Sequence, residues 1–134
     1  MSKRQHCAAL IVAAGHGVRA GEGLAKQYRA VAGIPVLRRS VSAFASHPSV
    51  DLVQVVINPE HRTLYEAAMD GLGLPSPIDG GETRQDSVRL GLEGLASAPP
   101  ALVLIHDAAR PLVPSELISA TVRALNLADG ALPV

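Results

Sequence analysis

Three short apolar runs constrain the fold of this chain more than any other feature. They span 8–12 (AALIV), 52–57 (LVQVVI) and 102–105 (LVLI), and each is followed within three residues by Gly, Pro or a charged residue. Because the runs are almost continuously apolar rather than alternating, each predicts a strand that is buried on both faces. A fourth run, 131–134, predicts the beginning of another strand. Helical segments separate the runs, so the sequence predicts an α/β fold, a Rossmann-like and mostly parallel sheet with helices on both faces.

Four segments have the spacing of amphipathic helices. The first begins near Pro35, which suits a first helical turn, and the second spans 60–72. The third follows Thr83 and Asp86, whose Thr-x-x-Asp spacing is typical of a helix start. The fourth spans 115–127. The residues expected to face the core are Val36, Leu37, Val41 and Phe44 in the first helix, Val88, Leu92 and Leu95 in the third, and Leu117, Val122 and Leu125 in the fourth.

Composition excludes several classes of function. The 134 residues carry 12 Lys and Arg against 12 Asp and Glu, so no basic face for nucleic acid is expected. Two Tyr, one Phe and no Trp are too few for a single-strand stacking platform. No stretch approaches the roughly 18 apolar residues of a membrane span. Lys3, Arg4 and the apolar run 7–14 are similar to a secretory signal, but the run is short and stops at Gly15, so we expect a cytoplasmic protein. The lone Cys7 is expected in the core.

A glycine-rich loop follows the first predicted strand. Gly15 and Gly17 let backbone N–H groups approach a phosphate without obstruction by a Cβ. Arg19 offers a guanidinium fork to phosphate oxygens, and Lys26 offers a point charge. The loop therefore predicts phosphate binding. The alternative is a glycine-rich turn that carries two solvated cations.

Dinucleotide binding is a rival interpretation of this loop. The sixth position of the Gly-x-Gly-x-x-Gly pattern is Ala20, which that motif tolerates, so it does not decide the question. The second predicted strand ends in Asn58 and Pro59, without the acidic residue that binds a ribose 2′-hydroxyl. An oxidoreductase domain that binds NAD is therefore disfavoured. No Gly-Lys-Ser/Thr follows the glycines, so the loop is not a Walker A motif either.

A second segment brings small residues together near a helix start. Gly80 and Gly81 precede the third predicted helix, so close backbone approach and helix-end N–H donors are expected there. With Ala13 and Ala14 they leave room for a flat base to reach the main chain. Ser87, one helical turn further, either adds a side-chain hydrogen bond or is an ordinary surface residue.

The third segment follows the third predicted strand. The carboxylate of Asp107 is a suitable Mg²⁺ ligand, directly or through water, because hard cations take oxygen donors. Alternatively, Asp107 caps the turn that follows it. Arg110 either binds phosphate or pairs with Asp107. We interpret His106 as structural rather than as a general base.

Together, these segments resemble the 2-C-methyl-D-erythritol 4-phosphate cytidylyltransferases of non-mevalonate isoprenoid biosynthesis. The matching stretches are 13–19 (AAGHGVR), 26–28 (KQY), 79–88 (DGGETRQDSV) and 106–111 (HDAARP), in the order found in that family. Ribitol 5-phosphate cytidylyltransferases are similar to it and are the alternative.

The resemblance implies a nucleotidyltransferase fold, Mg²⁺ as cofactor, and transfer of a cytidylyl group from CTP to a sugar-alcohol phosphate with release of pyrophosphate. It implies that Arg19 and Lys26 are the catalytic cations on the triphosphate and that Asp107 lies by the ribose and the metal. It also places Arg110 on the side of the second substrate. The residues that it implies around the nucleotide are Ala13, Ala14, Gly15, Gly17, Gly80, Gly81, Ser87 and Asp107.

Two departures from the family pattern affect these expectations. The family usually has Pro where this chain has Ala25, which removes a fixed φ before Lys26. The chain also stops at Val134, where the family continues. We therefore expect 1–134 to be the nucleotide-binding part of a nucleotidyltransferase domain that lacks its remainder, marginally stable when isolated, and homodimeric in the full-length form. The residues leave open whether a cyclodiphosphate synthase follows, and whether the chain turns over or is a nucleotide-binding module.

Overall fold

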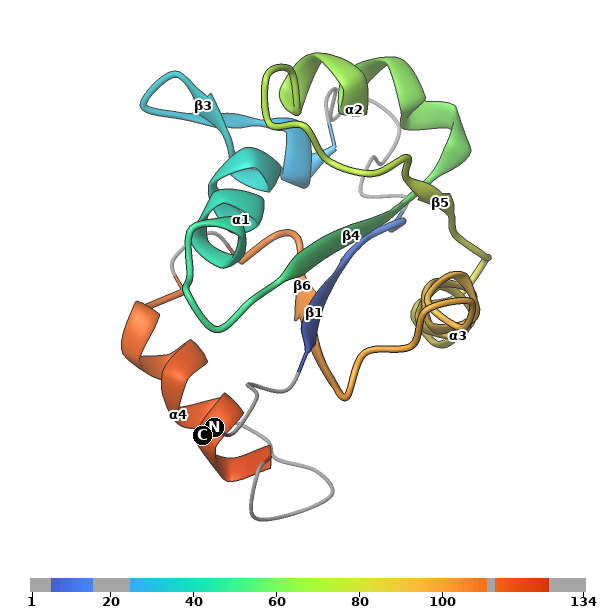
Figure 1. Ribbon diagram of the computed structural model, residues 1–134. Helices are drawn as coiled ribbons and strands as arrows, with labels where there is room; N and C mark the ends of the chain where they lie inside the picture. The colour runs from blue at the N-terminus through green and yellow to red at the C-terminus, as the bar shows by residue number, and fades with distance from the viewer. Residues whose placement is uncertain (1–5, 16–24, 111–112, 126–134) are drawn as a thin grey trace.

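The computed structural model describes residues 6–15, 25–110 and 113–125, which form a parallel sheet between two layers of helices (Figure 1). Within these residues the sheet has four strands in the order β5-β4-β1-β6. All three pairings are parallel, so the prediction of a mostly parallel α/β sheet is confirmed. The strands are β1 (Cys7–Ala13), β4 (Leu52–Ile57), β5 (Ile78–Asp79) and β6 (Leu102–Asp107). The strand predicted at 131–134 lies outside the described residues.

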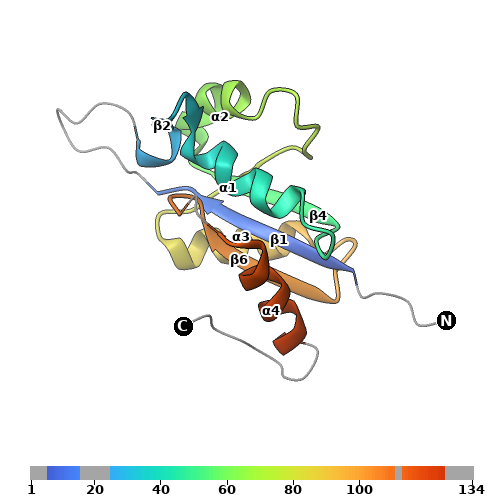
Figure 2. The same cartoon turned by 90° about the vertical axis from the view of Figure 1, so that its left-hand side faces the viewer.

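Helices cover both faces of the sheet, as the sequence predicts. Residues of α1, α2 and α4 pack with β1 and β4 in the larger of two core clusters, whereas α3 packs on the opposite face. Figure 2 shows α1 lying along β1. The helix bounds are α1 (Val36–Ala45), α2 (Arg62–Ala68), α3 (Arg84–Gly94) and α4 (Ser115–Leu125). The predicted helix 60–72 is shorter in the structure, because a 3₁₀ turn, η2 (Pro59–His61), replaces its first residues.

A small hairpin follows the first loop. It is preceded by a 3₁₀ turn, η1 (Lys26–Tyr28), and consists of β2 (Ala30–Val31) paired with β3 (Ile34–Pro35). Between the strands, Ala32 has φ 52° and Gly33 has φ 81°. Two consecutive positive φ values are typical of a type I′ turn, the two-residue turn whose twist matches that of the strands.

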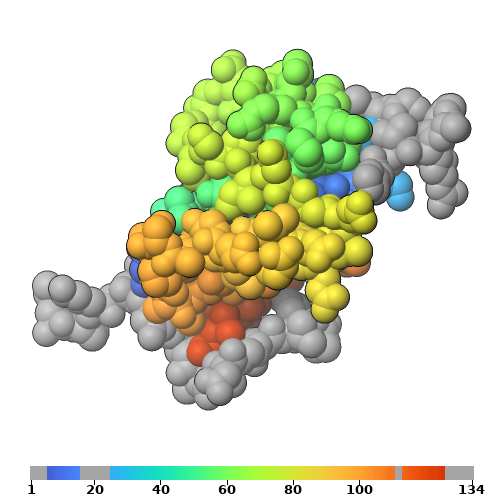
Figure 3. Space-filling model, turned by 90° about the vertical axis from the view of Figure 1, so that its right-hand side faces the viewer, coloured from blue at the N-terminus to red at the C-terminus, as the bar shows by residue number. Residues whose placement is uncertain are grey.

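The central strand β1 divides the core in two. All seven of its residues are buried, including Cys7, which is 1% exposed as predicted. Alternate side chains face opposite layers, so that Ile11 lies in the α1–α2–α4 cluster and Leu10 in the α3 cluster. Helix α3 lies very close to the sheet at Gly91. A Cβ added there would be 2.7 Å from Leu10 Cδ1 and 2.8 Å from Val56 Cγ2, so only glycine fits without a shift. Figure 3 shows α3 and the segment after it, yellow to orange, forming a band across this face.

Three core predictions are wrong. Leu92 of α3 is 42% exposed and Leu117 of α4 is 38% exposed, whereas Ile118 is buried in place of Leu117. Strand β6 is not buried on both faces, since Ile105 is 45% exposed. The reason is geometric: α3 contacts β1, β4 and β5, and β6 is the last strand in the order of the described sheet. In the described part of the chain, no helix is both long and apolar enough to cross a membrane.

Candidate functional site

Two adjoining cavities lie where the carboxyl ends of β1, β4, β5 and β6 meet. The β5 cavity, of about 190 Å³, is lined by Ala14, Asn58, Pro59, Gly80, Gly81 and Glu82. The β6 cavity, of about 150 Å³, is lined by Val12, Ala14, Gly15, Gly81, Glu82, Thr83, Arg84, Ser87 and Asp107. They share Ala14, Gly81 and Glu82, so they form one depression. Its combined size is at the lower end of the roughly 300–1,000 Å³ of small-molecule sites.

Strand register explains why these distant segments meet. Val12 of β1 pairs with Asp107 of β6, so the chain after β1 emerges beside Asp107. Ile57 of β4 pairs with Asp79 of β5, and Gly80 follows at the same end of the sheet. The carboxyl ends of parallel strands share one edge, which is where open α/β sheets bind ligands. The structure thus brings together six of the residues expected around the nucleotide: Ala14, Gly15, Gly80, Gly81, Ser87 and Asp107.

Gly80 is required by close packing rather than by its φ angle. A Cβ at this position would lie 2.3 Å from Ala14 Cβ, 2.7 Å from Ser87 Oγ and 3.2 Å from Val56 Cγ1. At Gly81 a Cβ would lie 2.6 Å from Asp86 Cβ. Glycine therefore lets the β5–α3 connection lie directly against the end of β1, which makes the wall of the cavities from backbone.

The N–H groups of the two glycines in this wall are bonded within the chain, so they are not the N–H donors that the sequence predicts at the helix start. The Gly80 N–H donates to the Ile57 carbonyl at 2.7 Å, and the Gly81 N–H donates to Ser87 Oγ at 3.1 Å. Ser87 is 1% exposed, so the alternative of an ordinary surface residue is wrong. Its hydroxyl fixes the Gly81 backbone, since it accepts from the Gly81 N–H and lies 3.5 Å from the Gly81 carbonyl oxygen. Carbonyl oxygens are the acceptors that the two glycines contribute to this wall.

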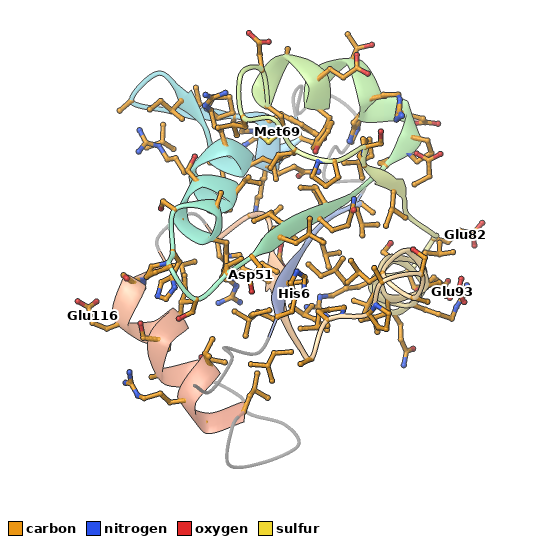
Figure 4. The ribbon with its side chains drawn as sticks, viewed as in Figure 1. His6, Asp51, Met69, Glu82, Glu93 and Glu116 are labelled. Carbon is orange, nitrogen blue, oxygen red and sulfur yellow. The ribbon has the colours of Figure 1, made fainter. Side chains whose placement is uncertain are left out.

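Helix α3 begins at the β6 cavity. Thr83 is its N-cap and Thr83 Oγ1 accepts from the Asp86 N–H at 3.0 Å, which confirms the predicted helix start. Helix geometry leaves the N–H groups of Arg84 and Gln85 without partners inside the helix. Arg84, whose side chain ends in a guanidinium group, lines the β6 cavity. Glu82, labelled in Figure 4, projects outward from the connection before the helix. Arg84 was not among the residues predicted at the site.

Asp107 is both a turn cap and a lining residue. Its Oδ1 accepts from the Ala109 N–H at 3.1 Å, while the side chain stays exposed at the cavity. Among the described residues no ion pair joins Asp107 to Arg110, so that alternative is wrong. His106 is structural, as predicted: His106 Nε2 hydrogen-bonds to the Arg110 carbonyl at 2.7 Å, and its ring contacts Phe44 with centroids 5.0 Å apart.

Three other predicted site residues that the structure describes lie outside the lining of these two cavities. Ala13 is 3% exposed and faces the α1–α2–α4 cluster, and its carbonyl accepts a hydrogen bond from the Gln27 side chain. Lys26 is exposed on η1, and Arg110 is exposed after β6. Gly17 and Arg19 lie outside the described residues.

Two buried polar side chains that the sequence analysis missed hold the loops around the site. Gln27 Nε2 donates to the carbonyl oxygens of Ala13 at 3.1 Å and Gly15 at 3.5 Å. Ser40 of α1, which is 0% exposed, places its hydroxyl 3.0 Å from the Ala108 carbonyl oxygen and 3.1 Å from that of Arg110. Gln27 lies inside the KQY motif, which was a usable signal. The sequence around Ser40 carried no such signal, because the residues that its hydroxyl contacts are 68 and 70 positions away.

A small aromatic cluster lies behind η1. The rings of Tyr28 and His61 meet edge to face with centroids 5.5 Å apart. The hydroxyls of Tyr28 and Tyr65 and the Nδ1 of His61 are buried without hydrogen-bond partners. Burial raises the pKa of both tyrosines. The negative charge of ionised Tyr65 adds to the rise at Tyr28, and Arg62 opposes it at Tyr65.

The fold and its strand-end site define an α/β domain of the nucleotidyltransferase type. Residues 7–134 match the family model of 2-C-methyl-D-erythritol 4-phosphate cytidylyltransferase (IspD), and the chain belongs to this family. A crystal structure of 4-diphosphocytidyl-2C-methyl-D-erythritol synthase superimposes with a TM-score of 0.76 and 30% identity, covering 95% of this chain and 57% of that chain. The nucleotidyltransferase fold that the resemblance implies is therefore confirmed.

Relatives in two bacteria are longer proteins. The bifunctional enzyme IspD/IspF of Rhodopseudomonas palustris (strain ATCC BAA-98 / CGA009) is 50% identical over 134 residues, which is 100% of this chain and 34% of that protein. The bifunctional enzyme IspD/IspF of Rhodospirillum rubrum is 54% identical over 127 residues, covering 94% of this chain and 33% of that protein. The chain thus spans about a third of the length of these relatives.

Proposed function

We propose that this chain is the nucleotide-binding part of an enzyme that transfers a cytidylyl group from CTP to 2-C-methyl-D-erythritol 4-phosphate. The observation that carries the proposal is the depression at the strand ends, where six residues expected at the nucleotide converge from three separate segments. Membership of the cytidylyltransferase family supports the same activity. A homodimer is part of the same proposal.

The polar groups of the wall favour cytosine over uracil. The N–H groups of Gly80 and Gly81 are used internally and the Ser87 hydroxyl is bonded to Gly81, so the wall offers a base mainly backbone carbonyl acceptors. Cytosine presents an amine that can donate to a carbonyl, whereas uracil presents an oxygen at the same position. A buried acceptor that meets another acceptor loses roughly 1–3 kcal/mol. UTP is therefore expected to bind at least about tenfold more weakly than CTP.

Mg²⁺ is the proposed cofactor, and Asp107 fits it as a single ligand. Among the described residues, no three His, Cys, Asp or Glu side chains could hold a metal by themselves. One carboxylate suffices here, because Mg²⁺ commonly takes one or two carboxylates together with substrate phosphates and water. Asp107 has one oxygen engaged by Ala109 N–H and its side chain at the cavity. The metal would neutralise phosphate charge.

The chain contributes positioning and charge rather than a covalent nucleophile. An oxygen of the substrate phosphate attacks the α-phosphorus of CTP, the bond from that phosphorus to the bridging oxygen breaks, and pyrophosphate leaves. Lys26 and Arg19 would stabilise the charge on the phosphate oxygens, and Arg110 would face the second substrate. Transfers of this kind depend on alignment and electrostatic stabilisation.

The test combines binding and turnover. Calorimetry with CTP, UTP and NAD, each with and without Mg²⁺, is expected to show CTP tightest and dependent on Mg²⁺. Pyrophosphate release is then measured with the protein as its source makes it, using 2-C-methyl-D-erythritol 4-phosphate and ribitol 5-phosphate in parallel. Faster release with ribitol 5-phosphate would assign the alternative substrate. CTP binding without release would indicate a nucleotide-binding module, and equal affinity for CTP and UTP would contradict the proposed base recognition.

A further inference from the structure

We propose that Gln27 is a positioning residue, which fixes Lys26 relative to the nucleotide cavity through the backbone carbonyls of Ala13 and Gly15. The inference rests on the proposed function for its kinetic part. Its geometric part rests on the structure alone. Gln27 is 6% exposed, and its Nε2 lies 3.1 Å from the Ala13 oxygen and 3.5 Å from the Gly15 oxygen.

The two carbonyls lie at the place where β1 becomes the cavity wall. Ala13 is the last residue of β1, and Gly15 lines the β6 cavity. Gln27 is the central residue of η1 and the direct neighbour of Lys26. One side-chain amide therefore ties the turn that carries the proposed catalytic cation to the edge of the site.

The described backbone hydrogen bonds of η1 are local. The Tyr28 N–H donates to the Ala25 carbonyl at 3.0 Å, and the Arg29 N–H donates to the Lys26 carbonyl at 3.2 Å. These bonds shape the turn, but they do not connect it to the sheet. Tyr28 packs in the α1–α2–α4 cluster, and the Gln27 amide supplies hydrogen bonds from η1 to the end of β1, across a sequence separation of 12 to 14 residues. Holding both ends of this intervening chain restricts where Lys26 can lie.

The chemistry of the contact requires a primary amide. Two carbonyl oxygens accept hydrogen bonds, and an NH₂ group supplies two donors from one nitrogen. Methionine has a similar length but supplies no donor. Glutamate has the same shape, yet its ionised carboxylate also supplies none and would face two carbonyl oxygens. It regains one donor only when protonated.

Gln54 provides a matched control. It is 7% exposed, and its Nε2 also contacts two carbonyl oxygens, that of Ser76 at 2.9 Å and that of Val55 at 3.3 Å. Gln54 lies within β4 and does not line either cavity. Gln54→Met and Gln27→Met therefore remove the same kind of buried contact, and only one of them holds η1.

The first measurement needs no ligand. Amide hydrogen exchange is followed in Gln27→Met, Gln54→Met and the unsubstituted protein, at a temperature well below all three Tm values. Gln27→Met is expected to accelerate exchange of the Tyr28 and Arg29 amides at least tenfold, while Gln54→Met leaves them within twofold. Equal exchange at these amides in both variants would show that Gln27 does not hold η1 in place.

The second measurement is steady-state cytidylyl transfer in the protein as its source makes it. Gln27→Met is expected to lower kcat at least tenfold with KM for CTP within threefold, and Gln54→Met to leave kcat within twofold. Gln27→Glu is expected to regain activity as pH falls, a profile that the unsubstituted protein lacks. Parallel losses in both methionine variants would overturn the positioning role. A complete absence of transfer in the unsubstituted protein would refute the proposed function. The exchange result would still decide whether Gln27 holds η1 against the end of β1.

Discussion

Replacing Gly80 with alanine would test the close contact between the β5–α3 connection and β1. The new Cβ would lie 2.3 Å from Ala14 Cβ and 2.7 Å from Ser87 Oγ. Separations under 3.0 Å cannot be kept, so either the connection or β1 must move. Ala14 and Ser87 are 6% and 1% exposed, and neither has a long flexible end that could turn aside. The displacement therefore moves the wall that Gly80 and Gly81 contribute to the cavities.

The cost can be estimated from overpacking. Forcing an extra methyl into a packed site typically costs about 1–3 kcal/mol. Gly80 has no positive φ, so alanine also lowers the conformational entropy of the unfolded chain, which offsets about 0.4–1 kcal/mol of this loss of stability. We expect the free energy of unfolding to fall by about 1–2 kcal/mol. At about 3–5 °C per kcal/mol for a chain of this length, Tm should fall by about 3–10 °C.

Urea denaturation of Gly80→Ala is compared with that of Gly15→Ala. Gly15 lines the same depression, but a Cβ there meets nothing within 4 Å. Gly15→Ala is therefore expected to keep or slightly raise the free energy of unfolding. Calorimetry should show CTP affinity reduced at least tenfold in Gly80→Ala, because the Ser87 to Gly81 contact is displaced. Equal stability of the two variants would refute the packing argument.

Three further predictions follow from individual contacts. Lys26→Ala is expected to lower kcat by roughly 10² to 10³ with a smaller effect on CTP affinity, measured by pyrophosphate release, because a donor on the phosphate acts mainly in the transition state. An unchanged kcat would remove Lys26 from the mechanism. Ser40→Ala should lower the free energy of unfolding by about 1–3 kcal/mol in urea, since it leaves the buried Ala108 carbonyl without its donor, while the Arg110 carbonyl keeps its hydrogen bond to His106. The raised pKa values of Tyr28 and Tyr65 mean that the unfolded state loses these protons first as pH passes 10, so the free energy of unfolding should fall between about pH 9 and about pH 11. A flat urea midpoint over that interval would contradict the burial of these phenols.

The sequence predicted the parts of the structure that depend on local pattern. Continuous apolar runs located β1, β4 and β6, and Thr83 with Asp86 located the start of α3. The glycine and carboxylate segments also met as expected, because parallel strands end at a common edge. Exposed Leu92 and Leu117 show where pattern was insufficient, since periodicity identifies a face but not how far the neighbouring layer extends over it.

The hydrogen bonding of the site could not be predicted, because it depends on contacts between distant residues. The Gly80 and Gly81 amides are consumed by Ile57 and Ser87, and only the folded chain shows which carbonyls and hydroxyls they meet. The same holds for Ser40, whose sequence surroundings resemble any apolar helix face. The effect of Ala25 in place of the family proline was also left open. Its φ of −56° lies in the range that proline adopts, so the backbone at this position is compatible with proline.

The aromatic cluster behind η1 gives this protein an optical property of its own. The sequence has no tryptophan, and its two tyrosines are both buried within this single cluster. Tyrosine absorbance and fluorescence therefore come from η1 and the adjoining helix α2, and are not masked by indole emission. An unlabelled sample thus carries a spectroscopic probe, Tyr28, within the turn that holds the proposed catalytic lysine.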